Sequence, residues 1–119
     1  MTHQLKLHSR PFAMIASGNK TIELRLYDEK RSQIQVGDTL VFTHSNDSAQ
    51  TLTAKVTALH RFPDFAALYA ALPLDKCGYL PEELSTASPE DMNVYYPIEK
   101  QARYGVVGIE ITRIEEEEK

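Results

Sequence analysis

The chain has 119 residues, which is enough for one hydrophobic core and too few for two ordinary ones, so a single domain is expected. Its apolar share of 42% and charged share of 25% are close to globular averages and exclude an intrinsically disordered chain. The formal net charge of −4 argues against a protein that binds a long nucleic-acid backbone through overall basicity, because phosphate binding needs lysine and arginine.

The first elements are predicted from residue 4 to Gly18. Weak alternation over residues 4–7 predicts a short first strand. Ser9 is a suitable N-cap, and Pro11 falls in the first turn of the helix that would follow. Gly18 stands where a left-handed C-terminal cap would end this short helix.

The apolar period then changes to two. Ile22, Leu24 and Leu26 alternate with polar residues, which predicts a strand over residues 21–26. Successive side chains of a strand point to opposite faces. The strand would therefore bury its aliphatic residues and present Glu23 and Arg25 together on the other face.

The middle of the chain predicts two more strands. Residues 28–35 form a polar, irregular connection, and the glycine and aspartate at 37–38 indicate a tight turn before a strand at 39–43. The sequence HSNDSAQ at residues 44–50 has the composition of an exposed loop. Alternation resumes over residues 51–59 as a strand rich in threonine and valine.

The last third predicts helices and then a closing strand. Helical spacing of apolar residues over 64–72, with a proline on each side, predicts a core helix. Residues 73–86 are loop-like with one helical turn near Glu82, Ser88 to Asp91 resembles a capping arrangement, and 97–103 could add another turn. Residues 106–114, VVGIEITRI, predict the last strand. This order suits an α+β fold with a mainly antiparallel sheet that could close into a small β-barrel.

Several classes of protein and site lack their sequence markers. No stretch approaches the roughly 18 apolar residues of a membrane helix, and no signal-peptide core is seen, so no membrane partner is expected. The lone Cys77 fits a reducing compartment, which makes a cytoplasmic location the expectation. The four histidines are too scattered for a metal template, and no GxGxxG, P-loop or GxSxG motif is found, so neither metal nor cofactor is expected.

Charge is distributed unevenly along the chain. Residues 1–61 carry a net charge of +3 and residues 62–119 a net charge of −7. Opposite charges are densest at Lys20, Glu23 and Arg25 and in the run 28–31. Charge alone favours an exposed strand with surface ion pairs worth about 0–1 kcal/mol each. The alternative is a site, because a carboxylate between two cations can receive a base edge or a sugar hydroxyl while the cations hold phosphate.

The same residues carry a resemblance to a known family. Gly18, Lys20, Glu23 and Arg25 reproduce the GxKxxExR motif of the ASCH domain family, which belongs to the PUA-like superfamily of small barrels. The run RLYDEKRSQIQVGDTLVF and the later YYPIEKQARYGVVGIEI also resemble segments of that family. The resemblance implies a single ASCH domain over residues 1–114, followed by an acidic tail at 115–119.

The resemblance implies a β-barrel with a cleft that is lined by the motif and binds RNA or modified nucleosides. The tyrosines of the C-terminal region, Tyr95 among them, could stack on a base, although tyrosines near strand ends are often core or rim residues. Arg31 could contact a phosphate or be an ordinary surface arginine. The candidate ligand-binding residues are Gly18, Lys20, Glu23, Arg25, Arg31, Tyr96, Glu99 and Tyr104.

Two further functions remain open. One branch that resembles this family hydrolyses N4-acetylcytidine, and here Lys20 would be the nucleophile or base, with Glu23 standing where that branch has threonine. The further carboxylate could be Glu90, Asp91 or Glu99. A ribonuclease could use Lys20 as an electrophile towards phosphate, but no histidine pair supports cleavage.

A protein-interaction domain is the third possibility. It would need an exposed apolar patch, for which Phe62, Phe65 and Leu80 are the candidates. The sequence names no protein partner and leaves open whether the chain is an enzyme.

Overall fold

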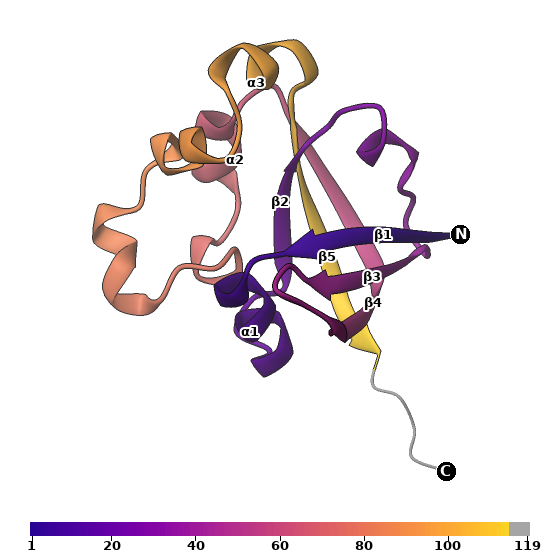
Figure 1. The fold of residues 1–119 in the computed structure, drawn as a ribbon. Coiled ribbons are helices and arrows are strands. Elements are labelled where there is room, and N and C mark those ends of the chain that lie inside the picture. The colour runs from indigo at the N-terminus through magenta and orange to yellow at the C-terminus, as the bar shows by residue number, and fades with distance from the viewer. Residues whose placement is uncertain (115–119) are drawn as a thin grey trace.

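The computed structural model describes residues 1–114, so the predicted acidic tail at 115–119 lies outside the described residues. The strands form one sheet, and short helices lie around it (Figure 1). The strands are β1 Thr2–Leu7, β2 Ile22–Leu26, β3 Thr39–His44, β4 Asp47–Phe62 and β5 Val106–Ile114. The α-helices are α1 Ser9–Ser17, α2 Phe65–Ala71 and α3 Ile98–Tyr104. Short 3-10 helices span Arg31–Gln33, Leu74–Lys76, Pro81–Thr86 and Pro89–Val94. No helix in this part of the chain is long and apolar enough to cross a membrane.

The five strands form a curled half-barrel in the order β1-β3-β4-β5-β2. The pair β1–β3 is parallel and the other three pairs are antiparallel, so the mainly antiparallel α+β prediction is confirmed. The expected closed barrel is corrected, because no ladder joins the edge strands β1 and β2 within residues 1–114. A side chain spans this gap instead: Arg25 on β2 donates from Nη2 to the Lys6 carbonyl on β1 at 2.9 Å.

Apolar clusters cover both faces of the sheet. One cluster lies inside the curl and includes Phe42 and Ile109, which are fully buried. The other packs the aliphatic residues of β2 against α2, where Phe65 and Leu68 are equally inaccessible. Every residue of β2 is therefore buried, so the exposed strand that charge alone favoured is not formed.

The apolar patch expected of an interaction domain is also not formed by its candidates. Phe65 is only 1% exposed, and Phe62 packs against the second cluster. Leu80 is half-buried.

Two element boundaries differ from the sequence predictions for identifiable reasons. Residues 44–50 are the turn and first strand residues of a β3–β4 hairpin, because β4 already begins at Asp47. Its residues 47–50 are exposed and polar, so they resemble a loop in composition. Ser9 is the first helical residue, since His8 occupies the N-cap position without a side-chain cap. Gly18 does end α1 in the left-handed conformation, as predicted, at φ 88°.

Gly105 holds the end of α3 close to the end of β4. Its backbone angles are φ 73° and ψ −173°, a region that only glycine occupies readily, and an added Cβ would lie 3.0 Å from the Phe62 carbonyl oxygen. We expect Gly105→Ala to lower the free energy of unfolding by about 1–3 kcal/mol in denaturant titrations.

Gly18→Ala is the control for this prediction. Its φ is also positive, but nothing lies within 4 Å of its added Cβ. Equal losses from the two substitutions would contradict the steric part of the explanation.

Candidate functional site

The motif residues are placed by the turn between α1 and β2. After Gly18 ends the helix, the Lys20 amide donates to the Met14 carbonyl at 3.1 Å, which turns the chain back along α1. The Thr21 amide then donates to the Lys76 carbonyl at 2.9 Å. Lys20 therefore stands directly before β2, on which Glu23 and Arg25 point to the same side.

Lys20, Glu23 and Arg25 form a buried ion triad. Lys20 Nζ lies 2.7 Å from Glu23 Oε1, and Arg25 Nε lies 2.7 Å from Glu23 Oε2. The side chains are 10%, 5% and 10% exposed respectively. A buried carboxylate held by two cations is unlike an exposed ion pair, so the surface interpretation of this cluster is wrong.

The charge state of Glu23 follows from two opposing effects. Burial disfavours the carboxylate, but the charges of Lys20 and Arg25 and their polar contacts outweigh burial and lower the pKa of Glu23 from 4.5 to about 2. Glu23 is therefore an anion at neutral pH, and the triad carries one net positive charge.

The triad leaves polar atoms available. Lys20 Nζ forms an ion pair with Glu23 Oε1, and Arg25 Nε donates to Glu23 Oε2. No acceptor within the described residues contacts Arg25 Nη1. A donor without a partner is available to a ligand or an ordered water.

A cleft of about 520 Å³ opens over the triad. Its floor is β2, one wall is the end of β1 with the start of α1, and the other wall is formed by α2 and the 3-10 segments that follow it. Its charged lining comprises the cations Lys6, Arg10, Lys20 and Arg25 and the carboxylates Glu23, Glu83 and Asp91. This volume is in the range of small-molecule sites, and the lining is only weakly cationic.

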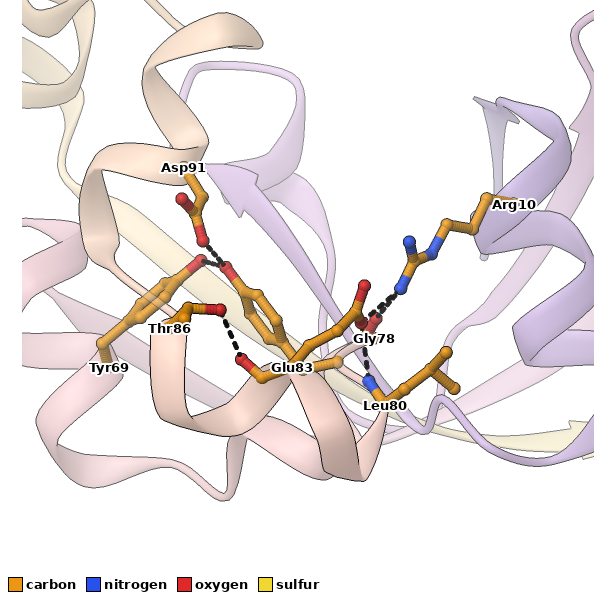
Figure 2. A network of polar contacts seen from close by, with 8 residues as sticks. Arg10, Tyr69, Gly78, Leu80, Glu83, Thr86 and Asp91 are labelled. Atoms are coloured by element: carbon orange, nitrogen blue, oxygen red, sulfur yellow. Dashed lines mark hydrogen bonds and ion pairs between the residues drawn. The ribbon is translucent and has the colours of Figure 1, made fainter.

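Two polar links build the outer wall, as Figure 2 shows. Arg10 on α1 reaches across to Glu83, whose carboxylate also accepts from the Leu80 amide at 2.8 Å. To the left of this link in the view, the hydroxyl of Tyr69 contacts that of Tyr79 at 2.7 Å, and Tyr79 donates to Asp91 at 2.7 Å.

The tyrosines of this wall remain protonated at neutral pH. Burial and the neighbouring phenol and carboxylate raise the pKa of Tyr79, and burial raises that of Tyr69. Both therefore keep their hydroxyl protons.

The cleft brings together some of the predicted residues and not others. Lys20, Glu23, Arg25 and Tyr96 all line it, and so does Tyr95 at the rim, where it is 61% exposed. Tyr96 stacks on Phe65 with ring centroids 6.1 Å apart. The burial of Tyr96 raises its pKa.

The remaining candidates lie outside the cleft lining. Gly18 acts through the turn, and Glu99 is exposed on α3. Tyr104 lines a separate hollow. Arg31 pairs with Asp28 at 3.2 Å, while its Nε is buried without a partner in residues 1–114.

The candidate carboxylates for catalysis are only partly brought into the site. Asp91 lines the cleft but is already bonded to Tyr79 and to the Ser88 amide. Glu90 and Glu99 are exposed and do not line it.

Sequence reasoning did not identify the outer wall. Arg10, Tyr69 and Tyr79 line the cleft, but each belongs to an ordinary local pattern. Tyr69 has helical spacing with core residues, and the partners of Arg10 and Tyr79 are distant in sequence or hidden in an irregular segment. Only the pairing of elements in space reveals them.

The donor set of the cleft favours polar recognition over metal binding. Within residues 1–114 no three histidine, cysteine or acidic side chains are arranged to hold a metal ion. Cys77 lines the cleft, where burial raises its thiol pKa to about 11, so it is not a thiolate at neutral pH. The cleft offers four cations, three carboxylates and tyrosine side chains.

Comparison with known proteins gives the following similarities. A family model described as the ASCH domain matches residues 5–115. The crystal structure of the hypothetical protein PH0355 is 30% identical, with a TM-score of 0.78, 96% of this chain covered and 100% of that chain. Protein PF0455 from Pyrococcus furiosus is 32% identical, with a TM-score of 0.69, 98% of this chain covered and 100% of that chain.

More distant structures share the fold. ASCH from Zymomonas mobilis is 14% identical, with a TM-score of 0.64, 92% of this chain covered and 65% of that chain. A search of curated proteins found no match.

Proposed function

Since the chain belongs to the ASCH domain family, whose members resemble RNA-binding domains, we propose that its cleft binds single-stranded RNA or a modified nucleoside through Lys20, Glu23 and Arg25. The observation that carries this proposal is the ion triad on the floor of the cleft, where the Glu23 carboxylate is held between the cations Lys20 and Arg25. A base edge or a ribose hydroxyl that enters the cleft would meet these charged groups.

The remaining polar atoms suit the other parts of such a ligand. Lys20 and the free Nη1 of Arg25 can donate to a carbonyl or a phosphate oxygen. Tyr96 lines the cleft beside the exposed ring of Tyr95, with ring centroids 6.5 Å apart. Base stacking on such rings is tolerant of sequence. The weakly cationic lining supports a nucleoside or a short single strand rather than a duplex.

The charge state of the triad supports binding more than catalysis. A carboxylate with a pKa of about 2 is a weak general base at neutral pH. Lys20 is engaged in an ion pair with that carboxylate at 2.7 Å, whereas a nucleophilic lysine needs a free, neutral amine. Hydrolysis of N4-acetylcytidine and cleavage of RNA therefore remain outcomes of the test, and no contact in the cleft favours either over binding.

A calorimetric titration with N4-acetylcytidine, cytidine and single-stranded RNA of about four nucleotides tests the proposal. We expect saturable binding by the wild type and a roughly 10- to 100-fold loss in Lys20→Ala, because a hydrogen bond to a charged group is removed from a desolvated site. Lys76→Ala is the matched control, since Lys76 is exposed and does not line the cleft.

Chromatography of the same mixtures separates binding from turnover. Product formed by the wild type and absent with Lys20→Ala would replace the proposal with an enzymatic function. The absence of binding to every compound, or equal binding by both lysine variants, would contradict it.

A further inference from the structure

A second hollow, of about 450 Å³, lies where the ends of β4 and α3 meet the start of β5. Tyr27, Arg61, Arg103 and Tyr104 line it, and we call it the arginine groove. Two arginines and no acidic residue line this groove within the described part of the chain. In a protein with a net charge of −4, such a one-sided lining is a local cationic site.

Each arginine of the groove lies over a tyrosine. The guanidinium carbon of Arg61 is 3.9 Å from the centroid of the Tyr27 ring, and that of Arg103 is 5.2 Å from the centroid of Tyr104. Both arginines are exposed, and neither side chain forms a hydrogen bond or ion pair within residues 1–114. Glu99, four residues before Arg103 on α3, forms no ion pair with it. Stacking thus orders the two guanidinium groups while their donor edges stay available.

Backbone contacts fix the two arginine–tyrosine pairs relative to each other. Gly105 allows the end of α3 to approach the Phe62 carbonyl on β4, because a Cβ at this position would lie 3.0 Å from the carbonyl oxygen. The Tyr27 amide donates to the Gly105 carbonyl at 3.0 Å, which ties the end of β2 to the same point. The groove is therefore built by main-chain contacts and does not depend on mobile side chains alone.

The groove is a neighbour of the cleft along β2. Arg25 lines the cleft, and Tyr27, two residues further along the chain, lines the groove. Tyr27 follows the last residue of β2, and two residues of extended chain span about 7 Å. Adjacent nucleotides of a single strand can bridge a separation of this size.

We propose that the arginine groove binds a nucleotide of single-stranded RNA whose neighbouring nucleotide occupies the cleft. This inference rests on the proposed function, and it makes the ligand an oligonucleotide that is held at two places. Arg61 and Arg103 donate to phosphate oxygens, and their stacked planes and the tyrosines beneath them accept a base by stacking. Each of the two sites then needs only a few cations, because the phosphate contacts of the RNA are divided between the cleft and the groove.

Fluorescence anisotropy with end-labelled RNA of about four to eight nucleotides tests the groove. The double variant Arg61→Ala/Arg103→Ala is compared with Lys55→Ala/Lys100→Ala, which removes two exposed cations from the same strand and the same helix outside both hollows. We expect the arginine variant to lose about tenfold or more in RNA affinity, and the lysine variant about twofold or less. The slope of log affinity against log salt concentration should become shallower by about 0.7 for each phosphate that the arginine variant no longer binds.

Nucleoside binding measured on the same variants separates the two proposals. Unchanged nucleoside affinity with weakened RNA affinity in the arginine variant is the expected result. If RNA and nucleoside bind equally tightly, or if the two double variants bind RNA alike, the groove proposal is overturned and the cleft proposal stands. If RNA binding depends on the arginines but not on Lys20, both proposals are overturned, because the groove proposal requires the neighbouring nucleotide to occupy the cleft. The absence of RNA binding overturns the groove proposal.

Discussion

Glu23→Gln is expected to lower the free energy of unfolding by about 3 kcal/mol, the largest loss we expect from any substitution in the cleft. The substitution keeps the shape of the side chain but leaves Lys20 and Arg25 as two neighbouring cations, each only 10% exposed, with no counter-charge. Thermal unfolding should shift downwards by roughly 10–15 °C. Chemical denaturation at neutral pH, with circular dichroism as the signal, measures the loss directly.

Glu110→Gln provides the control. Glu110 also pairs with a basic side chain, His60, at 2.9 Å, but its own side chain is 44% exposed. An exposed pair contributes about 0–1 kcal/mol, so the control should remain near wild type. A loss no larger in Glu23→Gln than in Glu110→Gln would show that the triad is not a buried charge cluster in solution.

Acid should remove the same stabilisation from the wild type. The pKa of Glu23 is lowered from 4.5 to about 2 by folding, so its contribution is fully present above pH 4.5 and is lost as the pH falls towards 2. The shift corresponds to about 3 kcal/mol. Stability measured from pH 7 to pH 2 should therefore fall more steeply for the wild type than for Glu23→Gln, and the two curves should converge near pH 2.

Asp38 titrates in the same range and needs its own control. Its pKa is also lowered to about 2, by a hydrogen bond from His3, by the Gln35 amide and by the N-terminal ammonium group. In an Asp38→Asn background the difference between wild-type Glu23 and Glu23→Gln should keep its dependence on pH. If the curves of unfolding free energy against pH run parallel for Glu23 and Glu23→Gln in that background, the acid sensitivity of the wild type comes from Asp38.

Most of the fold could be predicted because periodicity and capping are local. The strand at β2, the core helix α2 and the left-handed cap at Gly18 follow from alternation, helical spacing and the freedom of glycine. The β3–β4 hairpin was harder, since the pairing shifts register between Thr51 and Asp47 and residues 47–50 are exposed and mostly polar. Failure of the sheet to close depends on the relation between β1 and β2, which no local pattern encodes.

The residues on the floor of the cleft could be predicted from the sequence, whereas the residues of its walls could not. Lys20, Glu23 and Arg25 were identified by their spacing, and the family membership is confirmed. Their burial was not predictable, because charged residues are rarely buried and local charge density favours the surface. Arg10 meets Glu83 only through a contact that spans 73 residues of sequence. Glu99 and Tyr104 were grouped with the cleft through the likeness of their segment, and they lie elsewhere.

Arg25 has one more consequence. Its bond to the Lys6 carbonyl is the link between two sheet edges that would otherwise pair strand to strand in a closed barrel. The cleft is lined from both of those edges, by the end of β1 and by β2. The proposed ligand would thus bind next to the opening between β1 and β2, and the site exists because these two strands do not pair.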